Sequence, residues 1–214
     1  MDIRSLLTIC CLVLAPSMLC ATEPLHIGKF STGDLSGWTD KVFKGRTTYR
    51  LVSEDNHLVL KAHSVKSASG LIKKVNVDPI RFPILRWSWK VVNILPKEDI
   101  TQKSGDDFSA RVYVVFPSIF FWRTKAISYV WSSKMPKGSF APNPYTGNDM
   151  VVAVESGTEK LDRWINEERN IFEDYRKLFG EAPSQIGAVA IMTDTDDTQG
   201  EATAFYGDIF LYPK

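Results

Sequence analysis

Cysteine is almost absent from this sequence. Its three cysteines, Cys10, Cys11 and Cys20, all fall within the first 21 of 214 residues. The rest of the chain therefore has no thiol with which to form a disulfide or to bind a metal. A domain of this length buries roughly 70% of its unfolded surface, so a hydrophobic core can stabilise it without cross-links.

The sequence also lacks an excess of charge of either sign, with 26 Lys and Arg against 25 Asp and Glu. This balance argues against nucleic acid as a partner. There is no P-loop, no GxGxxG and no GxSxG motif, and the histidines His26, His57 and His63 lack the paired spacing of a zinc site. No stretch beyond residue 21 is long and apolar enough to span a membrane.

The first 21 residues have the pattern of an export signal. Arg4 and the amino terminus are positive, residues 6–14 form a short apolar run, and Ala21 is a small residue suited to cleavage. We therefore predict a signal peptide over 1–21 and one domain over 22–214, located in the periplasm or secreted. The oligomeric state is not indicated.

Apolar residues alternate with polar ones along most of the chain, which is typical of half-buried strands. In the segment 86–91, Trp87, Trp89 and Val91 share one face, while Arg86 and Lys90 lie on the other. Strands are predicted at 47–54, 57–63, 68–77, 84–93, 108–116, 126–132, 149–156, 187–193 and 202–212.

A different period marks one helix. Phe172, Tyr175, Leu178 and Phe179 recur at helical spacing, and Gly180 stands where a helix ends. The preceding segment 161–170 fits either state, and we favour a strand. Eight to ten strands with one helix predict a single antiparallel β-sandwich, a jelly roll like that of carbohydrate-binding modules.

Aspartates gather in MTDTDDTQGEATAFYGDI, residues 192–209. Asp194 and Asp196 begin like an EF-hand loop, but Gln199 and Phe205 occupy the positions that require glycine and glutamate. An irregular calcium site built on Asp194 and Asp196 remains one interpretation, and turn caps are the other. For Asp197 we favour a turn cap.

Two further acidic positions extend this set. Asp106 and Asp107 precede a predicted strand and offer additional oxygens. Asp208 lies within the last strand, where a buried carboxylate needs a partner; Arg111 and Arg86 are the candidates for an ion pair. The alternatives are that Asp208 faces solvent on the outer side of its sheet or reaches the same cation as Asp194.

Aromatic residues are the second signal. Most of the six tryptophans are expected to fill the core, but at least one exposed platform for a sugar ring is plausible. The segment 118–124, SIFFWRT, is predicted to be a loop tip that either folds back or forms an exposed apolar patch.

The ordered blocks LRWSWKV, GDDFSARVYVVF, YVWSS, RNIFEDYRKLFG, AIMTDTDDT and YGDI resemble the bacterial domain-of-unknown-function family 3047. The resemblance implies a single exported domain and no particular activity. It also implies that the residues in these blocks act together. With Tyr206 added for its aromatic ring, the candidate ligand-binding residues are Asp106, Asp107, Arg111, Arg169, Asn170, Asp194, Asp196, Tyr206 and Asp208.

Three functions are compatible with these features. The first is a non-catalytic envelope domain that binds a glycan or another polar ligand, stabilised by calcium. The second is a polysaccharide hydrolase or lyase that uses two of Asp106, Asp107, Glu168, Asp194 and Asp196. The third is a structural envelope protein that docks a partner through the 118–124 loop.

Overall fold

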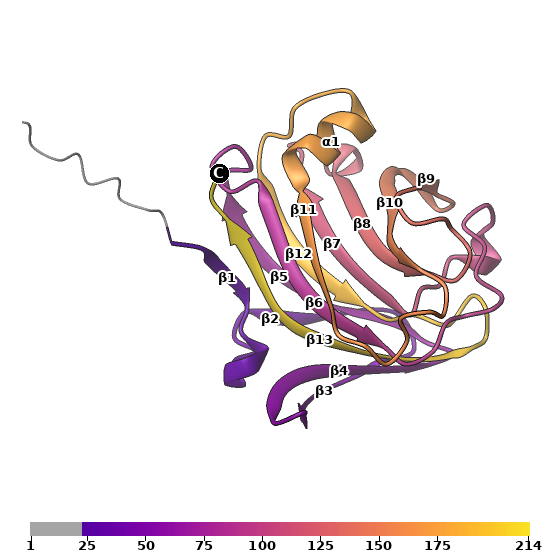
Figure 1. Cartoon of the computed structure of the whole chain (residues 1–214). Coiled ribbons are helices and arrows are strands. Elements are labelled where there is room, and N and C mark those ends of the chain that lie inside the picture. Colours follow the sequence, from indigo (N-terminus) through magenta and orange to yellow (C-terminus); the bar gives the residue numbers. More distant parts are fainter. Residues whose placement is uncertain (1–22) are drawn as a thin grey trace, which may run out of the picture.

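The computed structural model describes residues 23–214, so the predicted signal peptide lies outside the described residues. Two β-sheets pack face to face and form a β-sandwich, as predicted (Figure 1). A single α-helix, α1 (Ile171–Phe179), lies at one end of the sandwich in the described part.

One sheet has six strands in the order β11-β6-β13-β4-β3, with β1 paired to β13. Asp55 and Asn56 form the tight turn between β3 and β4, both with positive φ, as a two-residue hairpin requires. The strands of this sheet are β1 (Leu25–Gly28), β3 (Thr48–Glu54), β4 (His57–Val65), β6 (Ile84–Val91), β11 (Ile165–Asn170) and β13 (Glu201–Tyr212).

The other sheet has seven strands in the order β2-β5-β12-β7-β8-β10-β9. All its pairings are antiparallel except that of β8 with β10, which is parallel, so the predicted antiparallel sandwich is wrong for this one pair. The strands are β2 (Trp38–Lys44), β5 (Ala68–Val77), β7 (Ala110–Phe116), β8 (Lys125–Ser132), β9 (Phe140–Asn143), β10 (Thr146–Ser156) and β12 (Ile186–Met192).

A cluster of aromatic rings lies within the core between the sheets. Trp87 and Trp89 of β6 meet edge to face, with centroids 5.4 Å apart, and Trp87 stacks on Tyr129 of β8 at 5.5 Å. Trp131 approaches Trp89 at 6.2 Å. All four side chains are buried, and the partly buried Trp38 packs against the same core, so four of the six tryptophans lie in or against the core, as expected for most of them.

The helix forms where its periodicity predicts it. Asn170 accepts a hydrogen bond from the backbone N–H of Glu173 and caps the first turn, and Gly180 ends the helix in the left-handed conformation. Ile171 and Tyr175 bury their side chains against the core. Residues 165–170 are strand β11, which confirms the preference for a strand there.

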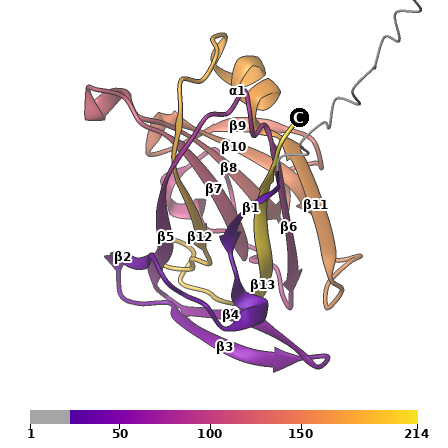
Figure 2. The same cartoon turned by 90° about the vertical axis from the view of Figure 1, so that its left-hand side faces the viewer.

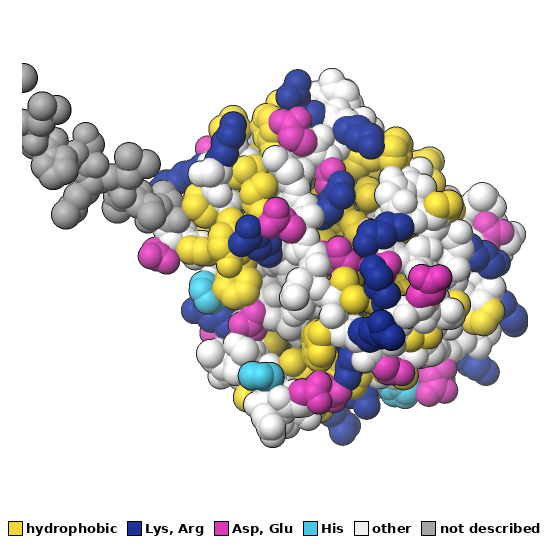
Figure 3. Space-filling view, viewed as in Figure 1, with side chains coloured by type: hydrophobic (Ala, Val, Ile, Leu, Met, Phe, Trp, Pro, Cys, Tyr) yellow, Lys and Arg dark blue, Asp and Glu magenta, His cyan; other side chains and the backbone are white. Residues whose placement is uncertain are grey.

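No helix in residues 23–214 is long and apolar enough to cross a membrane. The face seen in Figure 3 carries both basic and acidic side chains, with hydrophobic side chains between them.

The two ends of the sandwich differ. One end holds α1 and the loop between β7 and β8, which projects from the body in Figure 2, and the other holds the aspartate-rich loops.

Candidate functional site

The outer face of the seven-stranded sheet carries the candidate site. Along β7, Val112 and Val114 point into the core, so alternation places Arg111 and Tyr113 on the opposite face. A second small cluster covers half of this face, because Phe108 packs there on Val130 and Val151. The uncovered half is the groove.

Two adjoining cavities of about 470 and 280 Å³ make up this groove, and they share Phe43, Tyr113 and Met192. Phe43 is 65% exposed and Tyr145 is 55% exposed, so two exposed aromatic rings border the groove. The ammonium groups of Lys41 and Lys103 lie over these rings, 5.8 and 5.1 Å from their centroids. The remaining polar lining residues are Lys41, Lys44, Asp106, Arg111, Asn143, Asp149, Asp194, Asp196 and Asp197.

Arg111 organises the acidic end of the groove. Its guanidinium is buried and binds Asp194 through two hydrogen bonds, Nε to Oδ1 at 2.9 Å and Nη2 to Oδ2 at 2.6 Å. It also donates to the Asp106 carboxylate at 3.2 Å and lies over the ring of Phe108 at 4.4 Å. Asn143 donates to the other Asp106 oxygen at 2.7 Å, so the hydrogen-bond network around Arg111 joins three segments of the chain.

The sequence alternation Thr-Asp-Thr-Asp explains how the 193–196 segment is held. Thr193 donates to the carbonyl of Ser109 at 2.9 Å, and Thr195 is within hydrogen-bonding distance of Ser64 at 2.9 Å. Both threonines are buried. Asp194 and Asp196 therefore share the other side of the segment, as alternation predicts.

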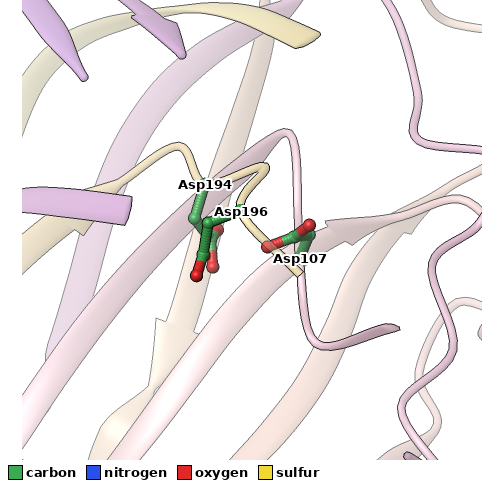
Figure 4. Close-up of side chains that lie close together, drawn as sticks. All are labelled: Asp107, Asp194 and Asp196. Carbon is green, nitrogen blue, oxygen red and sulfur yellow. The ribbon is translucent and has the colours of Figure 1, made fainter. Parts of the chain in front are cut away.

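Three carboxylates converge at this point. Ligand oxygens of Asp107, Asp194 and Asp196 all lie within 4.8 Å of one another, with Asp107 approaching from a separate segment (Figure 4). Asp107 accepts hydrogen bonds from the backbone N–H groups of Asp197 and Thr198, so it caps that turn. Asp196 is 3.5 Å from the Lys44 ammonium.

Burial raises the pKa of the Asp194 carboxyl, and Arg111 opposes this shift. Burial also raises the pKa of Asp196, with a further contribution from Asp107 and opposition from Lys44. Five aspartates, Asp106, Asp107, Asp194, Asp196 and Asp197, stand against the two cations Arg111 and Lys44. The acidic end is therefore short of positive charge.

Asp149 is a functional candidate that sequence reasoning missed. It lies at the groove on β10, where both carboxylate oxygens accept from the hydroxyl of Ser128 at 2.7 and 2.8 Å. Burial raises its pKa to about 6. Tyr113 and Phe43 were also missed, although the alternation of Arg111, Tyr113 and Val115 along the predicted strand already places Tyr113 on the face opposite the core.

The structure separates the other predicted site residues from this groove. Arg169 binds Asp174, and Asn170 caps α1. Tyr206 is buried behind the groove, where its hydroxyl donates to the carbonyl of Met192 at 2.7 Å. These three contacts are structural ones, and Tyr206 supports the acidic end from the core side.

Two predicted contacts are wrong. The Asp208 carboxylate, on the six-stranded sheet, binds the backbone N–H and hydroxyl of Ser31 at 2.8 and 2.6 Å and does not pair with an arginine. Arg86 pairs instead with Glu168. Asp197 does not cap its turn with its side chain, because Asp107 already does so; the Asp197 carboxylate accepts from the hydroxyl of Tyr145 at 2.9 Å.

The fold is a β-sandwich with an open groove on one outer face. Comparison of the sequence with known families identifies the family to which the chain belongs. Residues 36–210 match the family described as "Protein of unknown function (DUF3047)", so the chain belongs to that family, which confirms the resemblance. No curated protein matches the chain.

Solved structures similar to the chain include several sugar-binding domains. One, from a study of promiscuous carbohydrate-binding modules of the β-sandwich superfamily, is 14% identical, with a TM-score of 0.47; the match covers 87% of this chain and 61% of that one. The family 30 carbohydrate-binding module of a Clostridium thermocellum cellulase is 9% identical, with a TM-score of 0.49 and coverage of 90% and 99%. A xylan-binding domain from Paenibacillus barcinonensis is 11% identical, with a TM-score of 0.44 and coverage of 91% and 97%.

Replacing Arg111 by Met should destabilise the protein by about 3–5 kcal/mol, because two buried carboxylates lose their counter-charge. The double variant Arg111→Met/Asp194→Asn should lose less than the sum of the single losses. Urea unfolding followed by circular dichroism measures both. Arg86→Met, which breaks a solvent-exposed pair, is the control and should change stability little. Additive losses would contradict the proposed coupling.

Asp149→Asn should stabilise the protein at neutral pH and not at acidic pH. The folded pKa of about 6 lies above the ordinary value of 3.8, so the wild type loses stability as pH rises from about 4 to 6. The variant has no such charge to bury and should be more stable by about 1–2 kcal/mol above pH 7. Unfolding free energies at pH 4 and pH 8 measure this. An equal difference at both values would contradict it.

Proposed function

We propose that this protein is an exported envelope protein that binds a glycan, without catalysis, in the groove on the outer face of its seven-stranded sheet. The observation that carries the proposal is the pairing of exposed aromatic rings with a polar wall. Phe43 and Tyr145 offer exposed rings, and Asp149, Asp196 and Asp197 line the same groove.

Sugars suit such a surface for a simple chemical reason. The C–H groups on one face of a pyranose ring are apolar and pack on an aromatic ring, while its hydroxyls need hydrogen-bond acceptors. Carboxylates accept strong hydrogen bonds from hydroxyl groups. A groove with aromatic borders and few, well-placed polar groups is also the usual form of a ligand site.

The groove is long enough for more than one sugar unit. Its two cavities continue from the acidic end, beside Tyr145 and Asp197, to the sheet floor at Gly70, Ala190 and Asp149. Gly70 and Ala190 are small residues on this floor, and the close approach of β5 to β12 requires glycine at position 70, since a Cβ added there would lie 2.8 Å from the carbonyl oxygen of Ile191. We therefore favour a chain of sugars over a single monosaccharide.

The geometry gives less support to a hydrolase or lyase. Asp107 and Asp194 are buried and already committed, to backbone N–H groups and to Arg111. Glu168 lies on the other sheet in a pair with Arg86. Such carboxylates do not face each other across an open cleft, which an acid and base pair needs.

Calcium binding remains part of the proposal. The convergence of Asp107, Asp194 and Asp196 within 4.8 Å favours a cation, since calcium binds oxygen ligands from irregular loops. Both Asp194 oxygens already accept from Arg111, and both Asp107 oxygens accept from backbone N–H groups. Asp196 therefore has the most free acceptor capacity of the three, and a cation there would compete with Lys44.

Phe43→Ala should weaken binding to a glycan by about tenfold or more, because one stacking surface is lost. A glycan array with protein expressed from the full sequence identifies the sugar, and calorimetry then measures the affinity. Phe121→Ala, which removes an 81% exposed ring at the opposite end, is the matched control and should bind normally.

Two outcomes would overturn this proposal. A well-folded protein that binds no glycan across a broad array would exclude the sugar ligand. Cleavage of a bound glycan that is abolished by Asp149→Asn would favour the hydrolase or lyase instead.

Millimolar calcium should raise the midpoint of thermal unfolding by several degrees relative to EDTA, since a site filled to about a hundred times its Kd adds roughly 2.7 kcal/mol. Asp196→Asn should abolish the rise, and Asp208→Asn, on the opposite sheet, should preserve it. An equal midpoint in calcium and EDTA would remove calcium from the proposed function and leave the groove unaffected.

A further inference from the structure

The loop between β7 and β8 carries four exposed large apolar side chains in a row, including the two most exposed in residues 23–214, Ile119 and Phe121. Ile119 is 99% exposed, Phe121 81%, Trp122 59% and Phe120 49%. They are consecutive in the sequence and lie on a projection from the sandwich body (Figure 2). The loop folds outward, which decides between the two alternatives predicted from the sequence.

This loop has a defined conformation of its own. The 3-10 turn η3 (Phe121–Arg123) is closed by hydrogen bonds from Arg123 to Phe120 at 2.8 Å and from Thr124 to Phe121 at 3.1 Å. The Trp122 ring packs on both Phe120 and Phe121, with centroids 5.1 and 5.2 Å apart. Asn148 of β10 holds the Trp122 carbonyl at 2.7 Å. The aromatic rings are therefore presented as one preformed cluster.

The size of this cluster argues against a second protein as its occupant. Four such side chains at these exposures offer roughly 500 Å², whereas a stable protein interface buries about 800 Å² on each partner. A narrow projecting tip also gives a flat partner little to pack on. The apolar region of a lipid bilayer, in contrast, accepts such a tip without a complementary pocket.

The basic residues at the base of the loop also favour a lipid bilayer as the partner. Arg123 is exposed, forms no ion pair within residues 23–214, and lies over the Phe120 ring at 5.6 Å. Lys125 follows at the start of β8, paired with Glu181 across an open cleft of about 930 Å³ that also borders Ile119 and Arg123. Aromatic side chains flanked by a cation are the composition of segments that settle at the boundary between lipid headgroups and acyl chains.

We propose that the tip formed by residues 119–122 inserts into the headgroup boundary of a lipid bilayer, with Arg123 at the level of the phosphates. Insertion of this kind buries apolar side chains by roughly 5–10 Å. Arg123 adds attraction to anionic lipid of about 1 kcal/mol. The tip is an interfacial contact and does not span the bilayer. This inference does not depend on glycan binding in the groove.

Fluorescence of Trp122 tests the insertion directly. Protein expressed from the full sequence is mixed with vesicles of phosphatidylcholine and phosphatidylglycerol whose acyl chains carry bromine, which quenches nearby tryptophan. Subtracting the signal of Trp122→Phe isolates Trp122 from the other five tryptophans. The Trp122 emission should be quenched and should shift to shorter wavelength, whether or not the N-terminal segment also contacts lipid.

A pair of variants separates the tip from the rest of the molecule. Phe121→Ala combined with Ile119→Ser should lower vesicle partitioning by about tenfold or more, with an unchanged thermal midpoint because both side chains are exposed. Phe43→Ala, with a similarly exposed ring in the groove, should partition like the wild type. Arg123→Gln should weaken binding to anionic vesicles more than to pure phosphatidylcholine.

Two results would overturn the lipid assignment. One is Trp122 emission that brominated vesicles leave unchanged. The other is a concentration-dependent dimer in sedimentation velocity, without lipid, that the Phe121→Ala/Ile119→Ser variant abolishes; that result would assign the tip to a second copy of the chain.

Discussion

The buried guanidinium of Arg111 is the interaction on which the acidic end of this protein depends. A charge removed from water is tolerated only when it is paired and fully hydrogen-bonded, and Arg111 meets this condition with carboxylates from two different loops. Asp106 belongs to the segment before β7, and Asp194 follows β12. These loops are distant in sequence, so the ion network fixes their relative position, and the mouth of the groove forms as a consequence.

The groove exists because only half of the outer sheet face is covered. The long segment between β6 and β7 folds back over β8 and β10, where its Phe108 packs on Val130, Val151 and Ala153 together with Met135 from the segment after β8. The same segment ends in Asp106 and Asp107. Apolar packing on one side and the Arg111 network on the other therefore hold a single cover in place, and its edge is one wall of the groove.

Much of the fold could be predicted from the sequence, because strict alternation in segments such as 84–91 reports burial on one side only. Strands β1, β2 and β9, each paired with a neighbour on one side only, were missed. Such strands bury little and so alternate weakly: β2 contains the exposed Val42 and Phe43. The parallel pairing of β8 with β10 could not be predicted, because no local pattern reports which strands become neighbours.

The candidate site was predictable only in part, for a related reason. Asp194, Asp196 and Arg111 were found because charge within strand-like sequence needs an explanation. Which arginine pairs with which aspartate depends on the order of strands, so Asp208 was given the wrong partner. Asp149 was missed because a single aspartate at the start of a strand looks like an ordinary boundary residue; only its position beside Ser128 and Tyr113 in the groove distinguishes it.

Strand β7 connects the two surfaces for which functions are proposed above. It begins next to the Arg111 network and ends at the loop that carries Phe121 and Trp122, and its seven residues span roughly 20 Å. The two surfaces therefore lie at opposite ends of a rigid, doubly paired strand, held by β12 on one side and β8 on the other. A tip resting on a bilayer would direct the acidic mouth of the groove away from the lipid. In that orientation the mouth faces the aqueous space that an extended glycan occupies, and anionic headgroups stay apart from the uncompensated aspartates.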